Sequence, residues 1–433
     1  MTARRTHLPV LFLILTLLGC DRPDPAGVGA PRFTVGGVGR PSVLVNPNAN
    51  DHGTAKTIQE GIDMVGEGGT VRVLPGTYAE AIVIGKGLTL ESVGGESGSV
   101  VVEPPGAPTT AVAITTRAPV VIRGLTVHAT GVNGIRGAGV VDLTVERVSV
   151  TAVSPPLGVD RLISVGNDPN PTGARARLTV RESFMDGTIA CATWPAACTF
   201  DAAATFPQIF GIIAGGDVDA RLERNVIRRA GGACIFVVVR NDLGGETNVD
   251  ILDNDLDECH PLGRAGAIFV APAGGINPSV TLPVRVTGTV NTVGNTIANS
   301  SGSCLTSTAI SYVVLGGRIE RNRIAGVVQA CAFPTARARP GAIWLGSQLP
   351  FYPPVVAQLR FNDIAGNAQA GLRVGSNMTT PVDASCNWWG AASGPSGAGT
   401  GTGDAILVEL GGATPGFVPF ATAPIAASPA TGC

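Results

Sequence analysis

The residues best suited to chemistry lie between positions 240 and 264. Arg240 and Arg264 enclose a run of acids that includes Asp253 and Asp257, and His260 lies in the same stretch. β-Elimination from a uronic acid needs a base, often arginine or lysine, to take the C5 proton, and calcium held by acids to neutralise the carboxylate. The cluster is therefore a candidate lyase site with Ca²⁺ as its cofactor. Glycan binding without chemistry is a second interpretation, and a solvated set of turn residues, which we favour, is the third.

A second patch combines cations with aromatic rings. Arg337 and Arg339 precede Trp344, and Phe351 and Tyr352 follow in a proline-rich stretch. Surfaces that bind sugars or anionic polymers often use such side chains, because aromatic faces attract cations and give large apolar contacts. These are candidate binding residues. In the alternative that we favour, Trp344 lies in the core and Phe351 and Tyr352 cover a long loop.

The first twenty residues have the layout of an export signal. Two arginines precede an apolar run from Leu8 to Leu18, which is too short to span a bilayer comfortably. The run ends in Leu-Leu-Gly-Cys, which resembles the lipobox of bacterial lipoproteins. This implies a signal peptide at 1–19, lipidation at Cys20, a membrane anchor and a location in the cell envelope, facing the periplasm or the surface. An ordinary secretory peptide and an uncleaved anchor are the alternatives. The Pro/Gly-rich stretch 20–41 would then be a flexible tether.

Composition favours a chain of many short strands. Two of the 30 basic residues lie in the signal peptide, so the mature chain has a net charge of about −4 against its 32 acids. That balance argues against nucleic acid as a partner. Charged residues make up 14% and aromatic residues 5%, whereas Gly numbers 59 and Pro 32, which is typical of short strands joined by turns.

The cysteines predict disulfides. Eight remain besides the lipidated one, an even number in a compartment where disulfides persist. The absence of a Cys-x-x-Cys pair argues against zinc and dithiol redox chemistry. Two spacings, 25 and 27 residues, match the repeat length described below and would join adjacent coils; free thiols and crossed pairings are the alternatives. The predicted pairs are Cys191–Cys198, Cys234–Cys259, Cys304–Cys331 and Cys386–Cys433.

Periodicity predicts one short helix followed by strands. Residues 57–66 place Ile58, Ile62 and Val65 on one helical face, with Gly66 as the stop. From residue 69 onward, short alternating segments are separated by glycine turns, which is the pattern of strands. The prediction is therefore a single amphipathic helix at the start of an all-β chain.

A weak internal repeat of the form apolar-x-x-Asn-x-apolar runs through the strands. Its Asn positions are 29, 41, 27 and 40 residues apart, which fits coils of 25 to 30 residues with loops inserted in alternate coils. Equivalent residues of a parallel solenoid stack about 4.8 Å apart, so the amides can form a ladder at a coil corner. Ligand binding by these amides is the alternative. The repeat positions are Asn225, Asn254, Asn295, Asn322 and Asn362, with Ser183 in the same place one unit earlier.

The stretches 57–62, 73–80 and 88–90 together resemble the opening of the pectin-lyase-like β-helix superfamily, and are especially similar to the start of pectinesterases. Asn387-Trp388-Trp389-Gly390 looks like the closing segment of secreted bacterial β-helix-repeat proteins. The resemblance implies a single-stranded right-handed parallel β-helix over 42–412, and a Pro/Ala-rich tail at 413–433. The helix and the two tryptophans would cover the ends, which otherwise leave open sheet edges; sugar stacking by the tryptophans is the alternative.

The resemblance carries little information on activity. Pectinesterases use two aspartates in a Gly-x-x-Asp-Phe-x-x-Gly type of strand, and the chain has no match to it; residues 210–217 lack the Asp-Phe order. Glu80 in the entry turn is then structural. We expect a non-catalytic envelope scaffold that binds glycan or a protein partner through loops on one face. A polysaccharide lyase or hydrolase acting on uronate polymers is the alternative, and a spacer without ligand is a third.

Overall fold

A computed structural model describes most of the chain beyond the expected tether. The predicted signal peptide and lipidation at Cys20 lie outside the described residues. Within those residues, no helix is long and apolar enough to span a membrane. The described residues are 39–49, 54–106, 110–153, 160–167, 174–188, 209–239, 245–259, 266–272, 286–302, 308–329, 341–348, 352–367, 370–425 and 433.

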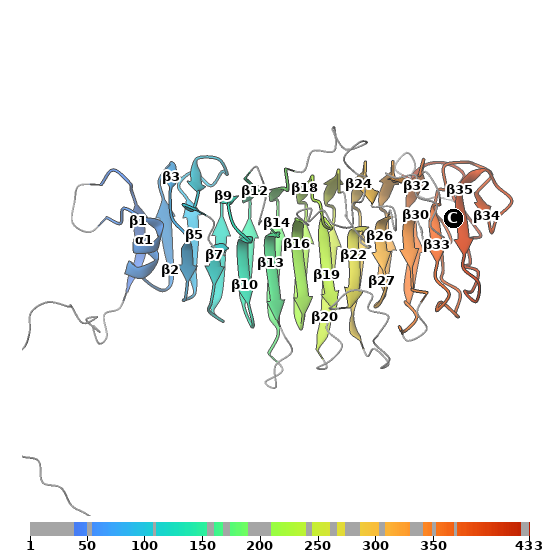
Figure 1. The fold of residues 1–433 in the computed structure, drawn as a ribbon, viewed down its shortest axis with the longest axis horizontal. Coiled ribbons are helices and arrows are strands. Elements are labelled where there is room, and N and C mark those ends of the chain that lie inside the picture. Colours follow the sequence, from blue (N-terminus) through green and yellow to red (C-terminus); the bar gives the residue numbers. More distant parts are fainter. Residues whose placement is uncertain are drawn as a thin grey trace, which may run out of the picture. The chain divides into compact units, whose positions relative to one another are not determined.

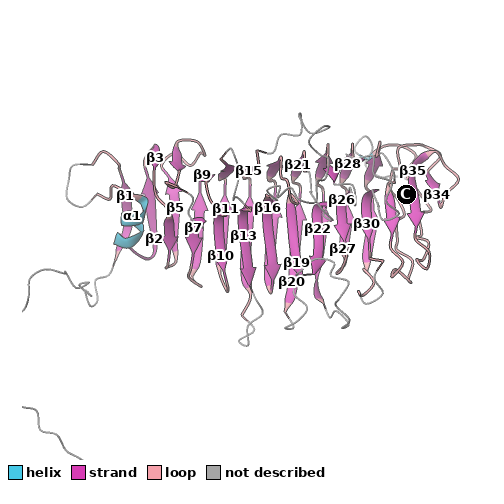
Figure 2. Cartoon of the chain, in the orientation of Figure 1, coloured by secondary structure: helices cyan, strands magenta, loops and turns pink. Residues whose placement is uncertain are grey.

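Three long parallel sheets form the structure (Figures 1 and 2). Sheet A contains β1 (Arg40–Val45), β2 (Val65–Val73), β5 (Leu88–Ser92), β8 (Pro119–Arg123), β11 (Asp142–Glu146), β14 (Ala176–Arg181), β17 (Val218–Glu223), β20 (Glu246–Leu252), β23 (Thr287–Val293), β27 (Gly317–Glu320) and β31 (Ala357–Arg360). Sheet B contains β3 (Gly76–Tyr78), β6 (Val100–Val102), β9 (Thr126–Ala129), β12 (Ser149–Ala152), β15 (Phe184–Asp186), β18 (Val226–Arg228), β21 (Asp255–Asp257), β24 (Thr296–Ala298), β28 (Arg323–Ala325) and β32 (Asp363–Ala365).

Sheet C contains β4 (Ile82–Ile84), β7 (Thr110–Ile114), β10 (Asn133–Ala138), β13 (Arg161–Asn167), β16 (Phe210–Gly216), β19 (Ile235–Val239), β22 (Gly266–Pro272), β26 (Thr308–Tyr312), β30 (Gly341–Leu345), β33 (Leu372–Val374), β34 (Pro395–Gly397) and β35 (Gly403–Val408). A small fourth sheet pairs β25 (Ser301–Gly302) with β29 (Val328–Gln329). Each coil passes through sheets A, B and C in turn, and the next coil pairs with it in parallel. The fold is the predicted right-handed parallel β-helix, with the hand that crossovers between parallel strands prefer.

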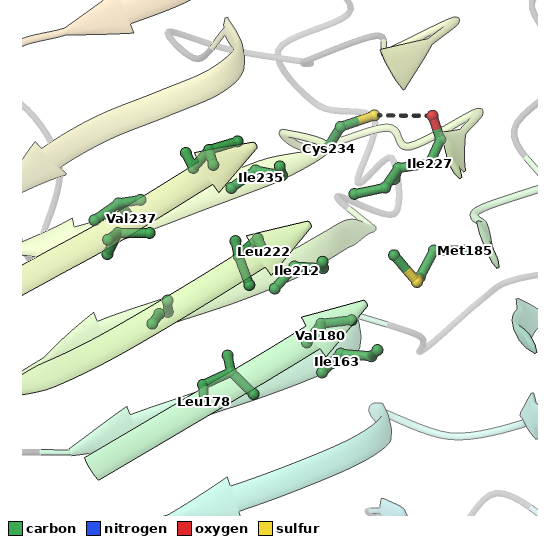
Figure 3. Close-up of a cluster of buried hydrophobic side chains, with 14 of the residues drawn as sticks. Ile163, Leu178, Val180, Met185, Ile212, Leu222, Ile227, Cys234, Ile235 and Val237 are labelled. Carbon is green, nitrogen blue, oxygen red and sulfur yellow. Dashed lines mark hydrogen bonds between the residues drawn. The ribbon is translucent and has the colours of Figure 1, made fainter. Parts of the chain in front are cut away.

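The core fills the inside of the coils (Figure 3). Alternate residues of the strands point inward. Because successive coils pair in parallel register, the side chain of each inward residue stacks on the equivalent side chain of the next coil. The inward row of sheet C shows this best, because it is isoleucine or leucine in nine successive register positions and each side chain is at most 1% exposed. Burying one such side chain stabilises the fold by about 1.5 to 3 kcal/mol. The row is Ile135, Ile163, Ile212, Ile235, Ile268, Ile310, Ile343, Leu372 and Ile406.

The predicted helix is α1 (Ile58–Met64), and it packs at the N-terminal end of the solenoid. Thr57 and Glu60 form a capping box at its start. The Glu80 carboxylate accepts hydrogen bonds from the backbone N–H groups of Ile58 (2.7 Å) and Gln59 (2.9 Å), which gives this acid the structural role expected of it. The predicted end of the helix at Gly66 was wrong, since the helix ends at Met64. Val65 already has extended backbone and ends the helix, because β2 begins there and pairs with β1.

The repeated asparagines form the predicted ladder between sheets A and B. From Asn254 onward, each amide oxygen accepts from the backbone N–H and the amide nitrogen of the asparagine one coil earlier, as Asn254 does toward Asn225 at 3.0 and 2.9 Å. Each amide nitrogen also donates to a carbonyl of the preceding coil, as Asn254 does to Leu222. Asn387 is the last rung, bonded to Asn362. All six amides are at most 1% exposed, so the ladder supports the structural interpretation.

Two of the predicted disulfides are present. Cys386–Cys433 has Cα atoms 5.3 Å apart, and Cys234–Cys259 has them 5.6 Å apart and joins adjacent coils. The latter does not join equivalent positions, however. Its 25-residue spacing is shorter than the local 29-residue repeat, so Cys234 at the start of β19 meets the end of sheet B in the next coil. The pairs Cys191–Cys198 and Cys304–Cys331 lie outside the described residues.

The C-terminal end is closed by the Trp-Trp segment and by the chain beyond it. Trp389 is fully buried and belongs to the core, which agrees with its expected role as a cap. Residues 413–425 continue to contact the solenoid: the N–H of Cys386 donates to Pro419, and the Phe420 ring packs against Gly394. The packed unit therefore extends past residue 412, the expected boundary, because Phe417 and Phe420 cover the last coil.

Candidate functional site

The structure does not gather the described acids of the predicted lyase cluster. Asp253 is exposed at the corner between sheets A and B, with φ of 53°. Asp257 faces outward from sheet B and accepts a hydrogen bond from the Asn299 amide at 2.9 Å. Arg240, His260 and Arg264 lie outside the described residues. The two acids thus have the surroundings of corner and surface residues, and no group of three metal-binding side chains occurs among the residues described.

Two aromatic members of the second patch, Trp344 and Tyr352, are buried, and Phe351 lies outside the described residues. Trp344 is 5% exposed and Tyr352 is 3% exposed, so neither offers a ring face to a ligand in solution. Trp344 points outward from sheet C and lies in register with Ser311 of β26. Arg337 and Arg339 lie outside the described residues. The burial favours packing of the two rings within the protein over the binding patch, but Trp344 lies on the outer side of sheet C and not inside the coils as the alternative had it.

A groove of about 470 Å³ lies instead on the outer face of sheet A, across β14, β17, β20 and β23. Each of these strands contributes two outward side chains, two residues apart. Its floor includes Leu178, Ala220 and Val249. The polar lining, taken in pairs from successive coils, is Arg177 and Thr179, Asp219 and Arg221, Asn248 and Asp250, and Thr289 and Asn291.

The two asparagine side chains of the groove are fixed in orientation by the backbone. The Asn248 oxygen accepts from the N–H of Thr289 at 3.1 Å, and the Asn291 oxygen accepts from the N–H of Arg318 at 3.1 Å. Because a backbone N–H can only donate, both amide nitrogens must point toward the neighbouring acids. They donate to Asp219 at 3.3 Å and to Asp250 at 2.8 Å.

Two glycines make this arrangement possible. Gly288 and Gly317 precede the two donating residues and have φ of 123° and 151°, a region that glycine enters far more easily than other residues. A Cβ atom at either position would lie about 2 Å from a backbone oxygen of the previous coil, at 2.0 Å from Thr247 and 2.1 Å from Val290. Glycine therefore lets each N–H approach the asparagine below it.

Arginine side chains lie at the edges of the groove. Arg175, just before β14, lies 3.3 Å from Asp217, 2.7 Å from Asp219 and 2.7 Å from Glu246, and so connects its own coil to the next two. Arg177 is 72% exposed and lies 3.5 Å from Asp142. Two arginines can therefore present guanidinium groups to a ligand, since Arg221 is also 51% exposed although it pairs with Glu223.

An apolar strip borders the polar lining. The outward row that reads Arg181 and Glu223 in the first two coils continues as Leu252 and Val293 in the next two. Leu252 is half-buried and Val293 is 7% exposed. The face therefore combines hydrogen-bonding groups with a narrow apolar edge.

Of the groove residues, only Asp250 belongs to the run of acids between Arg240 and Arg264, and the sequence analysis singled out none of the others. A signal for the others was nevertheless present. The outward residues lie four and six positions before the ladder residue of their coil, as Arg221 and Asp219 do before Asn225. Alignment of the strands on the repeated Asn would have placed all eight polar residues on one face.

Comparison with known proteins matches the chain to solved structures at low similarity. No family model and no curated protein matches it. A pectin methylesterase from Aspergillus niger in deglycosylated form is 12% identical with a TM-score of 0.29, over 60% of this chain and 77% of that one. The same enzyme in a penultimately deglycosylated form is 11% identical with a TM-score of 0.29, over 70% and 83%. The Dettilon tailspike protein is 14% identical with a TM-score of 0.42, over 85% and 68%.

Proposed function

We propose that this protein is an exported, lipid-anchored scaffold that binds a glycan, without catalysis, along the outer face of sheet A. The observation that carries the proposal is the groove across four coils, in which hydrogen bonds fix the orientation of Asp219, Asn248, Asp250 and Asn291. Fixed polar groups in a shallow depression are what a hydroxyl-rich ligand needs, because their orientation is set before binding and little conformational entropy is lost.

The charge pattern favours a neutral glycan over a polyanion. Arg177 and Arg221 are matched by Asp219 and Asp250, so the groove has no excess of positive charge to attract a uronate polymer. Hydroxyl groups can both donate to the carboxylates and accept from the guanidinium groups. The apolar strip at Leu252 gives the C–H face of a sugar ring a surface to contact.

The same network argues against a calcium-dependent lyase in this groove. Calcium needs six to eight oxygen ligands. Here the amide oxygens of Asn248 and Asn291 already accept backbone hydrogen bonds, and their nitrogens face the two carboxylates. The available oxygens are too few for a calcium site built from these side chains.

Membrane attachment is the second part of the proposal and rests on the sequence around Cys20. Metabolic labelling with a radioactive fatty acid in a bacterial host tests it directly. The labelled fatty acid should be incorporated into the wild-type protein and should be absent from the Cys20→Ala variant. Label retained in that variant would contradict lipidation at this residue.

Glycan binding can be tested by titration calorimetry of residues 21–433 against laminarin, dextran and polygalacturonate. We expect a neutral polymer to bind, with an affinity that changes little with salt. The Arg177→Ala/Arg221→Ala double variant should weaken binding at least about tenfold, the effect of losing one or two hydrogen bonds. Arg228→Ala is the matched control, since this arginine is 46% exposed on sheet B. Binding of no polymer, or equal loss in both variants, would contradict the proposal.

A polysaccharide lyase is the second candidate, because arginine and aspartate do converge in the groove. The observation in its favour is that Arg221 and Asp250 occupy register positions on adjacent strands. Ultraviolet absorbance of unsaturated products, followed with polygalacturonate in the presence and absence of calcium, separates the two functions. Product that disappears in Arg221→Ala would establish the lyase and overturn the non-catalytic proposal.

A further inference from the structure

The polar residues of the groove repeat as a pattern shifted by one coil. One register row reads Arg177, Asp219 and Asn248 on β14, β17 and β20. The neighbouring row, two residues further along the strands, starts one coil later. It reads Arg221, Asp250 and Asn291 on β17, β20 and β23.

The hydrogen bonding repeats together with the residue types. In each triad the asparagine amide donates to Oδ1 of the aspartate, Asn248 to Asp219 and Asn291 to Asp250. Arg175 also contacts Oδ1 of Asp219. Within the described part of the chain, neither Oδ2 atom accepts a hydrogen bond, so both carboxylates present an open acceptor at the same place in the pattern.

We propose that the two triads are equivalent subsites that engage two successive parts of one polymeric ligand. This inference rests on the proposed glycan-binding function. In each subsite the open Oδ2 accepts a sugar hydroxyl, and the exposed arginine of the same row donates to another oxygen of the ligand. The side chain of the asparagine holds the carboxylate in place.

The geometry sets the length of the ligand. Adjacent coils are about 4.8 Å apart, and two residues along a strand span about 6.6 Å, so the two subsites are separated by roughly 8 Å along a diagonal of the sheet. A single pyranose ring is too short to reach both. The groove therefore discriminates an oligosaccharide from its monomer.

Isosteric variants test the two subsites separately. In Asp219→Asn or Asp250→Asn, the amide oxygen should take the Oδ1 position, because that position faces the donating asparagine. The new NH₂ group then replaces the open acceptor with a donor, at almost no change in shape. Asp255→Asn is the matched control, because Asp255 is 49% exposed on sheet B and lies 3.9 Å from Arg228.

The experiment is titration calorimetry of residues 21–433 with laminarin, dextran and cellulose oligomers of one to six sugars. We expect one series to show a step of about 100-fold in affinity once the oligomer spans both subsites, the gain from linking two sites. Each single variant should keep the weak binding of short oligomers and lose the step, whereas the double variant should bind neither.

The possible failures are distinguishable. A smooth rise in affinity with length, or complete loss of binding in one single variant, would overturn the two-subsite inference and leave glycan binding intact. Absence of binding in every series would overturn both. Loss of the step in Asp255→Asn, with the fold unchanged by circular dichroism, would place the ligand elsewhere and also overturn the inference.

Discussion

At the scale of the residue, each ladder asparagine satisfies a backbone N–H and a backbone C=O of the preceding coil. Asn295, for example, accepts from Asn254 and donates to the Ile251 carbonyl and to the Asn322 oxygen. Buried polar groups that lose their partners cost about 1 to 3 kcal/mol each. The ladder thus ties successive coils at one corner, and it permits the left-handed backbone of the residue before each asparagine, such as Asp253.

Replacement of one rung should be costly. We expect Asn295→Ala to lower the free energy of unfolding by at least about 3 kcal/mol, because it leaves several buried groups without partners. Asn295→Ser should cost less, since Ser183 occupies the equivalent place in the first rung and accepts from Val148. Urea denaturation followed by circular dichroism measures both. Thr296→Ala, at the exposed neighbouring residue, is the control. An equally large loss of unfolding free energy in that variant would contradict the proposed role of the ladder.

One carboxylate on sheet A makes stability depend on pH. Burial acts to raise the pKa of Glu223, but the hydrogen bonds and charges of Arg221 and Arg224 outweigh it and hold the pKa below its usual value. A lowered pKa gives stability that is present above the unfolded value, about 4.3, and is lost as the pH falls through the folded value. Glu223→Gln should therefore be less stable than the wild type at neutral pH. The difference should disappear in strong acid; a difference that grows on acidification would contradict the assignment.

At the scale of the element, opposite charges alternate along one outward row of sheet A. Successive register positions read Arg72, Glu91, Arg123, Glu146 and Arg181. Ion pairs join neighbours, such as Arg181 and Glu146 at 3.0 Å. Each exposed pair contributes little, but pairing that skipped a coil would place like charges together, such as Arg72 and Arg123. The row therefore favours one pairing of the coils.

The helix that covers the first coil depends on Glu80. Removal of its carboxylate leaves the N–H groups of Ile58 and Gln59 without their acceptor, so Glu80→Ala should destabilise the N-terminal coil by about 1 kcal/mol or more. Hydrogen–deuterium exchange should show faster exchange in α1, β1 and β2, with the middle coils unchanged. Glu96→Ala, an exposed acid in the next coil, is the control. Unchanged exchange in α1 would contradict the capping role.

The Cys234–Cys259 disulfide should stabilise the middle of the solenoid. A crosslink that closes a loop of this length is worth about 3 kcal/mol through the unfolded state. The Cys234→Ala/Cys259→Ala variant should therefore unfold at lower urea concentration than the wild type, and a reductant should remove most of the difference. Equal midpoints without reductant would show that the bond adds no stability.

At the scale of the whole molecule, the coil length and the ladder were predicted from the sequence, whereas the groove was missed although its residues keep a fixed spacing from the repeated Asn. The repeated Asn and the alternating apolar residues define the coil length and the ladder, because parallel stacking places equivalent residues in contact. The groove depends on which strands become neighbours. Arg177 and Asn248 are 71 residues apart in sequence, and only the register of β14, β17 and β20 brings them to one face.

The described acids of the candidate lyase cluster illustrate the same point. Asp253 and Asp257 are close in sequence, but the corner between sheets A and B turns one onto the edge and the other onto a different face. Residues at equivalent positions of successive coils are therefore better candidates for one site than residues that are merely close in sequence. The Cys234–Cys259 disulfide is a further example. It joins two adjacent coils at positions that are not equivalent, so its spacing in sequence differs from the repeat length.

The most direct test of the central claim is hydrogen–deuterium exchange of residues 21–433 with and without a saturating neutral glycan found to bind. A ligand in the groove should slow exchange in β14, β17, β20 and β23 and leave the strands of sheets B and C at their original rates. Protection confined to sheet C, or spread evenly over the coils, would contradict a binding site on the outer face of sheet A.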